Sequence, residues 1–152
     1  MLDALVTPNF ALSEFVVSDT AARLGIDNTP PAMVEANLRN VLIPAMQQIR
    51  DLLMFPVMIK SGYRSPKLNA AVRGASASDH VTGHAADFVC PAYGSPRAVC
   101  ERLLELQHRI KFDQLINEGG GWIHVSFSPR RRNEVLTAHF GQDGRVRYTQ
   151  GL

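Results

Sequence analysis

Two short segments carry the residues whose types and spacing could do chemistry. In the segment 78–87, His80 is followed seven residues later by Asp87, and in the segment 118–124, Glu118 precedes His124 by six residues. A hydrolytic zinc site needs these groups: three protein ligands hold the ion, water takes the fourth position, and a free carboxylate accepts the proton of that water. The sequence therefore predicts a zinc-dependent hydrolase.

The first histidine and its carboxylate require a turn followed by a strand. If the backbone is extended from Thr82 to Val89, Asp87 shares a face with Gly83, and His84 points to the opposite face. His80 precedes this strand, where a turn could swing its ring over the face of Asp87. Gly83 would permit a close backbone approach.

A helix is the competing arrangement for the same residues. His80 and His84 are four residues apart and would share a helix face, as in the zincin motif H-E-x-x-H. However, Val81 stands where that motif has its catalytic Glu, and Gly83 weakens a helix. We therefore favour the strand, with His84 away from the metal.

The second segment reads as a glycine hairpin followed by a half-buried strand. Trp122 and His124 alternate with apolar residues, so they lie on the polar face, and Trp122 forms one wall of the site. The glycines 119–121 would turn the chain so that Glu118 lies beside His124. Glu118 is the preferred general base, and Asp113 is a weaker candidate.

Hydrophobic periodicity and turn residues predict the remaining elements. Helices are common in the first half of the chain and hairpins in the second, which predicts an α+β fold whose antiparallel sheet carries the zinc site and is covered by helices. The expected helices are 20–24, 31–53 with a kink at Pro44, a turn at 67–72 and 95–108; the expected strands are 55–60, 82–89, 113–118, 122–128, 135–140 and 145–149.

Length and composition predict one ordinary globular domain covering 1–152, with 45% hydrophobic residues and a net charge of +2. The chain has no secretory signal pattern and no apolar run long enough to span a membrane, so we expect it to be cytoplasmic when synthesised. No nucleic-acid-binding motif accompanies its arginines, which argues against a nucleic-acid partner.

Two further features of the sequence allow a structural interpretation. The run Arg130–Arg132 is either a solvated basic loop or a surface that attracts an anionic partner. Cys90 and Cys100 are not spaced as a C-x-x-C pair, so we expect them to be small buried core residues. The spacing does not exclude a disulfide between them.

Five segments carry a resemblance to a known family. Ser78–Asp87 fits the pattern S-x-H-x-x-G-x-A-x-D, and Trp122–His124 fits W-x-H. Phe10–Phe15, Ser61–Pro66 and Asp113–Glu118 are similar to further landmarks of the same proteins. Nearly the whole chain resembles the D-alanyl-D-alanine carboxypeptidase-like zinc metallopeptidases, which have the hedgehog/DD-peptidase fold, and within them the small branch common in phages and prophages.

The resemblance implies a role for each matched residue. It implies zinc bound by His80, Asp87 and His124, with Glu118 as general base. It also implies that Arg64 contacts a carbonyl or carboxylate of the substrate and stabilises the oxyanion, because a guanidinium suits that task. Ser78 is expected to donate a hydrogen bond to the same substrate, the peptide stem of peptidoglycan.

Several functions are consistent with this resemblance. The leading hypothesis is an endolysin-type peptidase that acts on the cell wall as a monomer after release by a holin-type partner. The alternatives are a non-catalytic zinc-fold binding or virion protein, and a cytoplasmic D-Ala-D-Ala dipeptidase or carboxypeptidase. An intact Glu118 and Arg64 argue against the binding protein, which needs neither residue. The sequence leaves open which peptidoglycan bond is cut.

Overall fold

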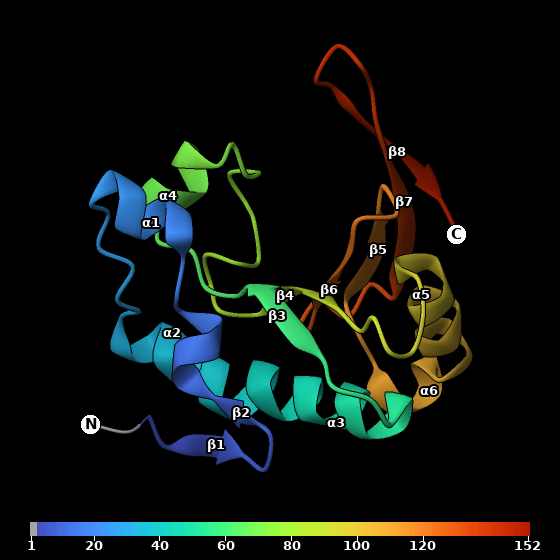
Figure 1. Ribbon diagram of the computed structural model, residues 1–152, viewed down its shortest axis with the longest axis horizontal. Coiled ribbons are helices and arrows are strands. Elements are labelled where there is room, and N and C mark those ends of the chain that lie inside the picture. Colours follow the sequence, from blue (N-terminus) through green and yellow to red (C-terminus); the bar gives the residue numbers. More distant parts are fainter. Residues whose placement is uncertain (1–2) are drawn as a thin grey trace.

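A six-stranded sheet forms the centre of the computed structural model, which describes residues 3–152. The fold is α+β, as predicted (Figure 1). The strand order is β3-β4-β6-β5-β7-β8, and a separate two-stranded sheet joins β1 (Leu5–Thr7) to β2 (Phe10–Ala11). The six strands are β3 (Met58–Ser61), β4 (Ala85–Val89), β5 (Gln114–Glu118), β6 (Trp122–Ser126), β7 (Glu134–Phe140) and β8 (Val146–Gln150).

One strand pair departs from the predicted antiparallel sheet, because β7 runs parallel to β5. The hairpin from β5 to β6 returns the chain to the end of the sheet where β5 begins. The short segment 127–133 then crosses to the free edge of β5 at that same end, so β7 starts beside Gln114 and follows the direction of β5. The final hairpin, β7–β8, is antiparallel, and the turn with Asp143 and Gly144 closes it as predicted.

Helices cover the sheet face opposite to the predicted metal ligands. Residues of β4, β5 and β6 alternate, so that Phe88, Leu115 and Val125 are buried in one core together with side chains of α3 (Ile43–Leu53) and α5 (Pro96–Glu105). The other helices are α1 (Asp19–Leu24), α2 (Ala32–Asn37), α4 (Pro66–Ala71) and α6 (Gln107–Ile110), with a 3₁₀ segment at Leu12–Phe15. Cys90 and Cys100 are buried and free, as expected for core residues.

The long helical pattern before residue 53 is continuous, and Pro44 changes its hydrogen bonding without breaking the helix. A π-helical turn, Leu38–Leu42, joins α2 to α3. The N–H of Ile43 bonds to the carbonyl of Leu38, five residues back. Because a proline ring crowds the carbonyl of the preceding turn and has no N–H to donate, a wider turn just before Pro44 accommodates it.

The strand that carries Asp87 begins later than predicted, at Ala85 instead of Thr82. The preceding residues form turns, and Gly83 has φ of +75°, a left-handed conformation that favours glycine. A Cβ at Gly83 would lie 3.0 Å from both Cγ1 and the carbonyl oxygen of Val34 in α2. The expected close backbone approach at Gly83 is therefore present, and it lets the turn before β4 pack directly against α2.

Asp113 anchors the segment that leads into β7. Its fully buried carboxylate accepts hydrogen bonds from Arg132 at three positions, the backbone N (2.8 Å), Nε (3.1 Å) and Nη2 (2.8 Å), and from Nη2 of Arg130 (3.3 Å) and Oγ of Ser126 (3.3 Å). Burial alone would raise the pKa of Asp113, but these arginines lower it below its ordinary value. The arginine run is therefore partly committed to internal ion pairs.

No helix among residues 3–152 is both long enough and apolar enough to cross a membrane.

Asp113→Asn should lower the free energy of unfolding by about 1–3 kcal/mol near pH 7, because the amide leaves two arginines imperfectly paired. Folding lowers the pKa of Asp113, so its stabilisation is complete above ~3.9 and is lost as the pH falls through the lower folded-state pKa. Urea unfolding at pH 7 and pH 3 should show a smaller difference from wild type at pH 3.

Glu101→Gln is the control for this comparison, because Glu101 pairs with Arg97 on an exposed helix face and should contribute only about 0.5 kcal/mol or less. An Asp113→Asn effect as small as that of the control at pH 7 would contradict the anchoring role.

Candidate metal centre and catalytic groups

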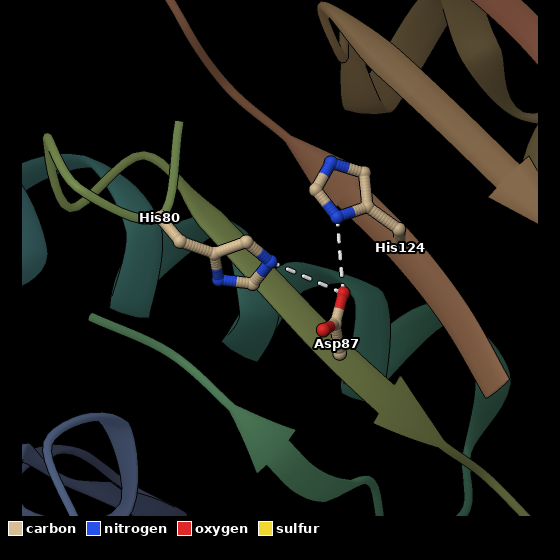
Figure 2. Close-up of side chains that lie close together, drawn as sticks. All are labelled: His80, Asp87 and His124. Atoms are coloured by element: carbon tan, nitrogen blue, oxygen red, sulfur yellow. Dashed lines mark hydrogen bonds and ion pairs between the residues drawn. The ribbon is translucent and has the colours of Figure 1, made fainter. Parts of the chain in front are cut away.

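Three side chains from three different segments meet on the sheet face opposite to the helices. His80 lies in the turn before β4, Asp87 in β4 and His124 in β6, and the two rings point at the same carboxylate (Figure 2). Oδ1 of Asp87 lies 3.2 Å from Nε2 of His80 and 3.0 Å from Nδ1 of His124. One ligand atom from each residue lies within 4.8 Å of the others, a spacing that suits a single metal ion.

The tautomer of His80 shows that these residues fit a cation. Its Nδ1 lies 2.6 Å from the carbonyl oxygen of Gly62, which can only accept a hydrogen bond, so Nδ1 carries the proton. Burial lowers the pKa of His80 and favours the neutral ring, in which Nε2 has only a lone pair. That lone pair faces the ionised oxygen of Asp87, an arrangement that a positive ion between them would stabilise.

The loop that supplies the Gly62 carbonyl is fixed by the N-terminal part of the chain. The side chain of Asn28 donates to the carbonyl of Tyr63 (3.1 Å) and accepts from the N–H of Ser65 (2.7 Å). The N–H of Tyr63 bonds to the carbonyl of Phe15 (2.7 Å), and a Cβ at Gly62 would collide with the backbone of Phe15. Gly62 is therefore required for this close packing.

Asp87 remains ionised, and its two oxygens have different partners. Burial by itself would raise its pKa, but the hydrogen bond from Nδ1 of His124 (3.0 Å) holds the pKa below its ordinary value. Nη2 of Arg64 donates to Oδ2 (3.0 Å), which leaves Oδ1 to face the histidines. Arg64 is held in turn by Ser61 and Asn69, which accept from its Nε and Nη1.

The strand register places Glu118 on the same face as the three ligands. Asp87 pairs with His124, His124 pairs with Ile116, and Glu118 is two residues beyond Ile116 and opposite Trp122. Side chains two residues apart in a strand share a face. Burial raises the pKa of Glu118, and its carboxylate has no side-chain hydrogen-bond partner among the described residues. Its oxygens are therefore free to accept a proton from a nearby water.

Ser78 and Trp122 both line the cavity beside these groups, which has a volume of about 500 Å³. The oxygen of Ser78 also accepts a hydrogen bond from the N–H of His80 (3.3 Å), so it supports the turn that carries this histidine. The ring of Trp122 stacks on Phe140. Arg64 lines this cavity and a second one of about 720 Å³ near β3.

His84 and Asp113 are not part of the metal group. Nδ1 of His84 lies 2.9 Å from the hydroxyl of Thr82, and His84 is not among the residues whose ligand atoms converge. The helical His80/His84 arrangement is absent, because turns occupy 79–83. Asp113 is committed to Arg130 and Arg132, which makes it unsuitable as the base.

The family model of peptidase M15 matches residues 8–126, which include His80, Asp87, His124, Glu118 and Arg64. The chain belongs to the peptidase M15 family. Peptidases of this family are zinc-dependent and act on peptidoglycan, in agreement with the resemblance noted in the sequence. A comparison with curated proteins gives no match to the chain. Residues 127–152, with β7 and β8, lie outside the matched region.

Several residues that shape the site were not identified from the sequence. Asn28 and Asn69 hold the loop and the arginine beside Asp87, and Phe140 and Tyr148 line the cavity from β7 and β8. No local pattern distinguishes an asparagine that braces a distant loop from one in an ordinary turn. The two aromatic residues reach the cavity through the parallel pairing of β5 with β7, which no local sequence pattern indicates.

His80→Ala should abolish tight zinc binding, because only two ligands remain, whereas His84→Ala should retain about one zinc ion per chain. Metal analysis after dialysis against a weak chelator measures both variants. Loss of zinc in His84→Ala to the same extent as in His80→Ala would support the helical arrangement and contradict the site described here.

Proposed function

We propose that the chain hydrolyses peptide bonds in peptidoglycan stem peptides or crosslinks, with His80, Asp87 and His124 as zinc ligands and Glu118 as general base. The observation that carries this proposal is the convergence of three ligand atoms within 4.8 Å, with Glu118 on the same face of the sheet. A zinc ion held by these ligands would act as a Lewis acid, acidifying water and polarising the scissile carbonyl.

Glu118 carries the proton in this reaction. It takes a proton from the attacking water as the new C–O bond forms, and it delivers that proton to the amine as the C–N bond breaks. Burial raises the pKa of Glu118, so the carboxylic acid holds the proton until the leaving nitrogen becomes basic enough to take it. The absence of a competing side-chain partner among residues 3–152 leaves the carboxylate available for this shuttle.

Arg64 serves two purposes in the proposed mechanism. It orients Asp87 by donating to Oδ2, and three of its five N–H groups are used by Ser61, Asn69 and Asp87. The remaining two can donate to the substrate carbonyl as negative charge develops on it, or to a substrate carboxylate. Ser78 and Trp122, which line the same cavity, are the proposed substrate contacts beside it.

The resemblance to the small phage branch favours an endolysin-type role. In this form of the proposal the chain is made in the cytoplasm, is released by a holin-type partner and acts on the wall as a monomer formed by one domain. A purely binding role is less well supported, because a binding module has no use for a partly buried carboxylate without a hydrogen-bond partner beside the ligands. Cleavage of crosslinked muropeptides, compared with free D-Ala-D-Ala, separates an endopeptidase from a carboxypeptidase.

Glu118→Gln should keep zinc bound and lower the rate of muropeptide cleavage by about 10²–10⁴-fold, because an amide cannot accept the proton. Mass spectrometry of the released fragments and metal analysis of the same sample provide the two measurements. Glu105→Gln is a control on an exposed helix face, where the residue pairs with Arg102. Cleavage by Glu118→Gln at the rate of this control would remove Glu118 from the mechanism.

Arg64→Lys should lower zinc affinity by about 10–100-fold and also raise KM, because an ammonium group cannot hold Asp87, Ser61 and Asn69 together. Chelator competition measures the first effect, and kinetics at saturating zinc measure the second. Arg97→Lys, in an exposed pair with Glu101, is the control and should change neither. Unchanged zinc affinity together with unchanged KM would contradict both roles of Arg64.

A further inference from the structure

The sheet face that carries the metal group continues past Glu118 into the β7–β8 hairpin. Glu118 pairs with Ala138 of β7, and Ala138 pairs with Tyr148 of β8. Paired residues point to the same side of a sheet, so Tyr148 shares the face of Glu118 and His124. This hairpin lies outside residues 8–126, the part of the chain that matches the family.

Aromatic packing fixes the hairpin against the site. Phe140 of β7 stacks on Trp122, with ring centroids 5.6 Å apart and an interplanar angle of 29°. Gly119 has φ of +60°, and a Cβ at this position would collide with the ring of Phe140. The glycine after Glu118 therefore allows the turn and also leaves room for the ring of Phe140. The position of the hairpin thus depends on side-chain packing as well as on backbone pairing.

Tyr148 presents a hydrogen-bond donor to the cavity. It lines the cavity together with Glu118 and Asp87, is 51% exposed, and its hydroxyl has no partner among residues 3–152. Partial burial and the nearby charges of Glu118 and Asp87 raise the pKa of Tyr148, so its hydroxyl keeps its proton at neutral pH. A protonated phenol beside a polar cavity can donate to a carbonyl or a carboxylate.

The distance from the metal group to β8 determines which substrates can reach Tyr148. Adjacent strands are ~4.8 Å apart, so the three steps from β6 to β8 cover roughly 14 Å along the sheet. An extended peptide advances ~3.3–3.6 Å per residue, so a dipeptide extends only about one residue to either side of its scissile bond. A longer stem peptide can approach Tyr148, whereas a dipeptide held at the metal group ends short of it.

We propose that Tyr148 is a substrate-binding residue that selects long or crosslinked stem peptides over dipeptides. Its hydroxyl donates a hydrogen bond to a carbonyl or carboxylate of the peptide, about four residues from the scissile bond, and the Trp122–Phe140 pair forms an apolar surface beside that contact. This inference deepens the proposed function and depends on the same site. It assigns part of the substrate preference to a hairpin that the family match does not cover.

Binding measured without turnover tests this proposal. Zinc-loaded Glu118→Gln protein, with and without the additional change Tyr148→Phe, is titrated with a crosslinked muropeptide dimer by calorimetry. The same proteins are titrated by NMR with the two-residue fragment that contains the same scissile bond. Loss of the hydroxyl should weaken binding of the dimer by about 3- to 10-fold and leave fragment binding unchanged within about twofold.

Thr149→Val is the matched control, because Thr149 lies next to Tyr148 in β8 but points to the opposite face, where it contacts His139. It should leave binding of both ligands unchanged. Equal weakening of dimer and fragment by Tyr148→Phe, or no weakening of either, would overturn the proposal. If wild-type protein fails to cleave the dimer while Tyr148→Phe still weakens its binding selectively, the catalytic proposal fails and the binding role of Tyr148 stands.

Discussion

The hydrogen bond from Nδ1 of His80 to the carbonyl of Gly62 is the contact on which the metal group depends. Without it, the ring could carry its proton on either nitrogen and could rotate away from Asp87. The bond is available only because the loop at Gly62 packs directly against the backbone of Phe15, where a larger residue would not fit. A 3₁₀ segment near the start of the chain thus determines the orientation of the proposed ligand His80, 65 positions after Phe15.

Charge is distributed around Asp87 so that one oxygen remains directed at the two histidines. Arg64 holds the other oxygen, and the same arginine is fixed by Ser61 and Asn69. A buried carboxylate with a guanidinium on one side is stable when a second positive group lies on the other side. The electrostatics of this group and the geometry of its ligand atoms therefore favour the same occupant, a divalent cation.

The features predicted from the sequence are those that depend on local pattern, and the features missed depend on contacts between distant segments. Alternation placed Trp122 and His124 on one strand face, and the glycine hairpin predicted that Glu118 lies beside them. The parallel pairing of β7 was not predicted, because no local pattern reveals which edge of β5 a strand will join. The ion pairs of Arg130 and Arg132 with Asp113 were not predicted either, because they join distant segments and a run of arginines usually indicates a solvated loop.

The order of the strands separates the parts of the site that must be rigid from the parts that can vary. The strands of the proposed ligands, β4 and β6, and β5 with the proposed base Glu118, are each paired on both edges, which holds these groups in a fixed geometry. β8 is an edge strand, and all five of its residues are exposed. A side chain on β8 can therefore change without disturbing the ligands, while Phe140 and Trp122 keep the hairpin beside the cavity. An edge of this kind is a suitable place for residues that adapt one metal centre to different lengths of peptide.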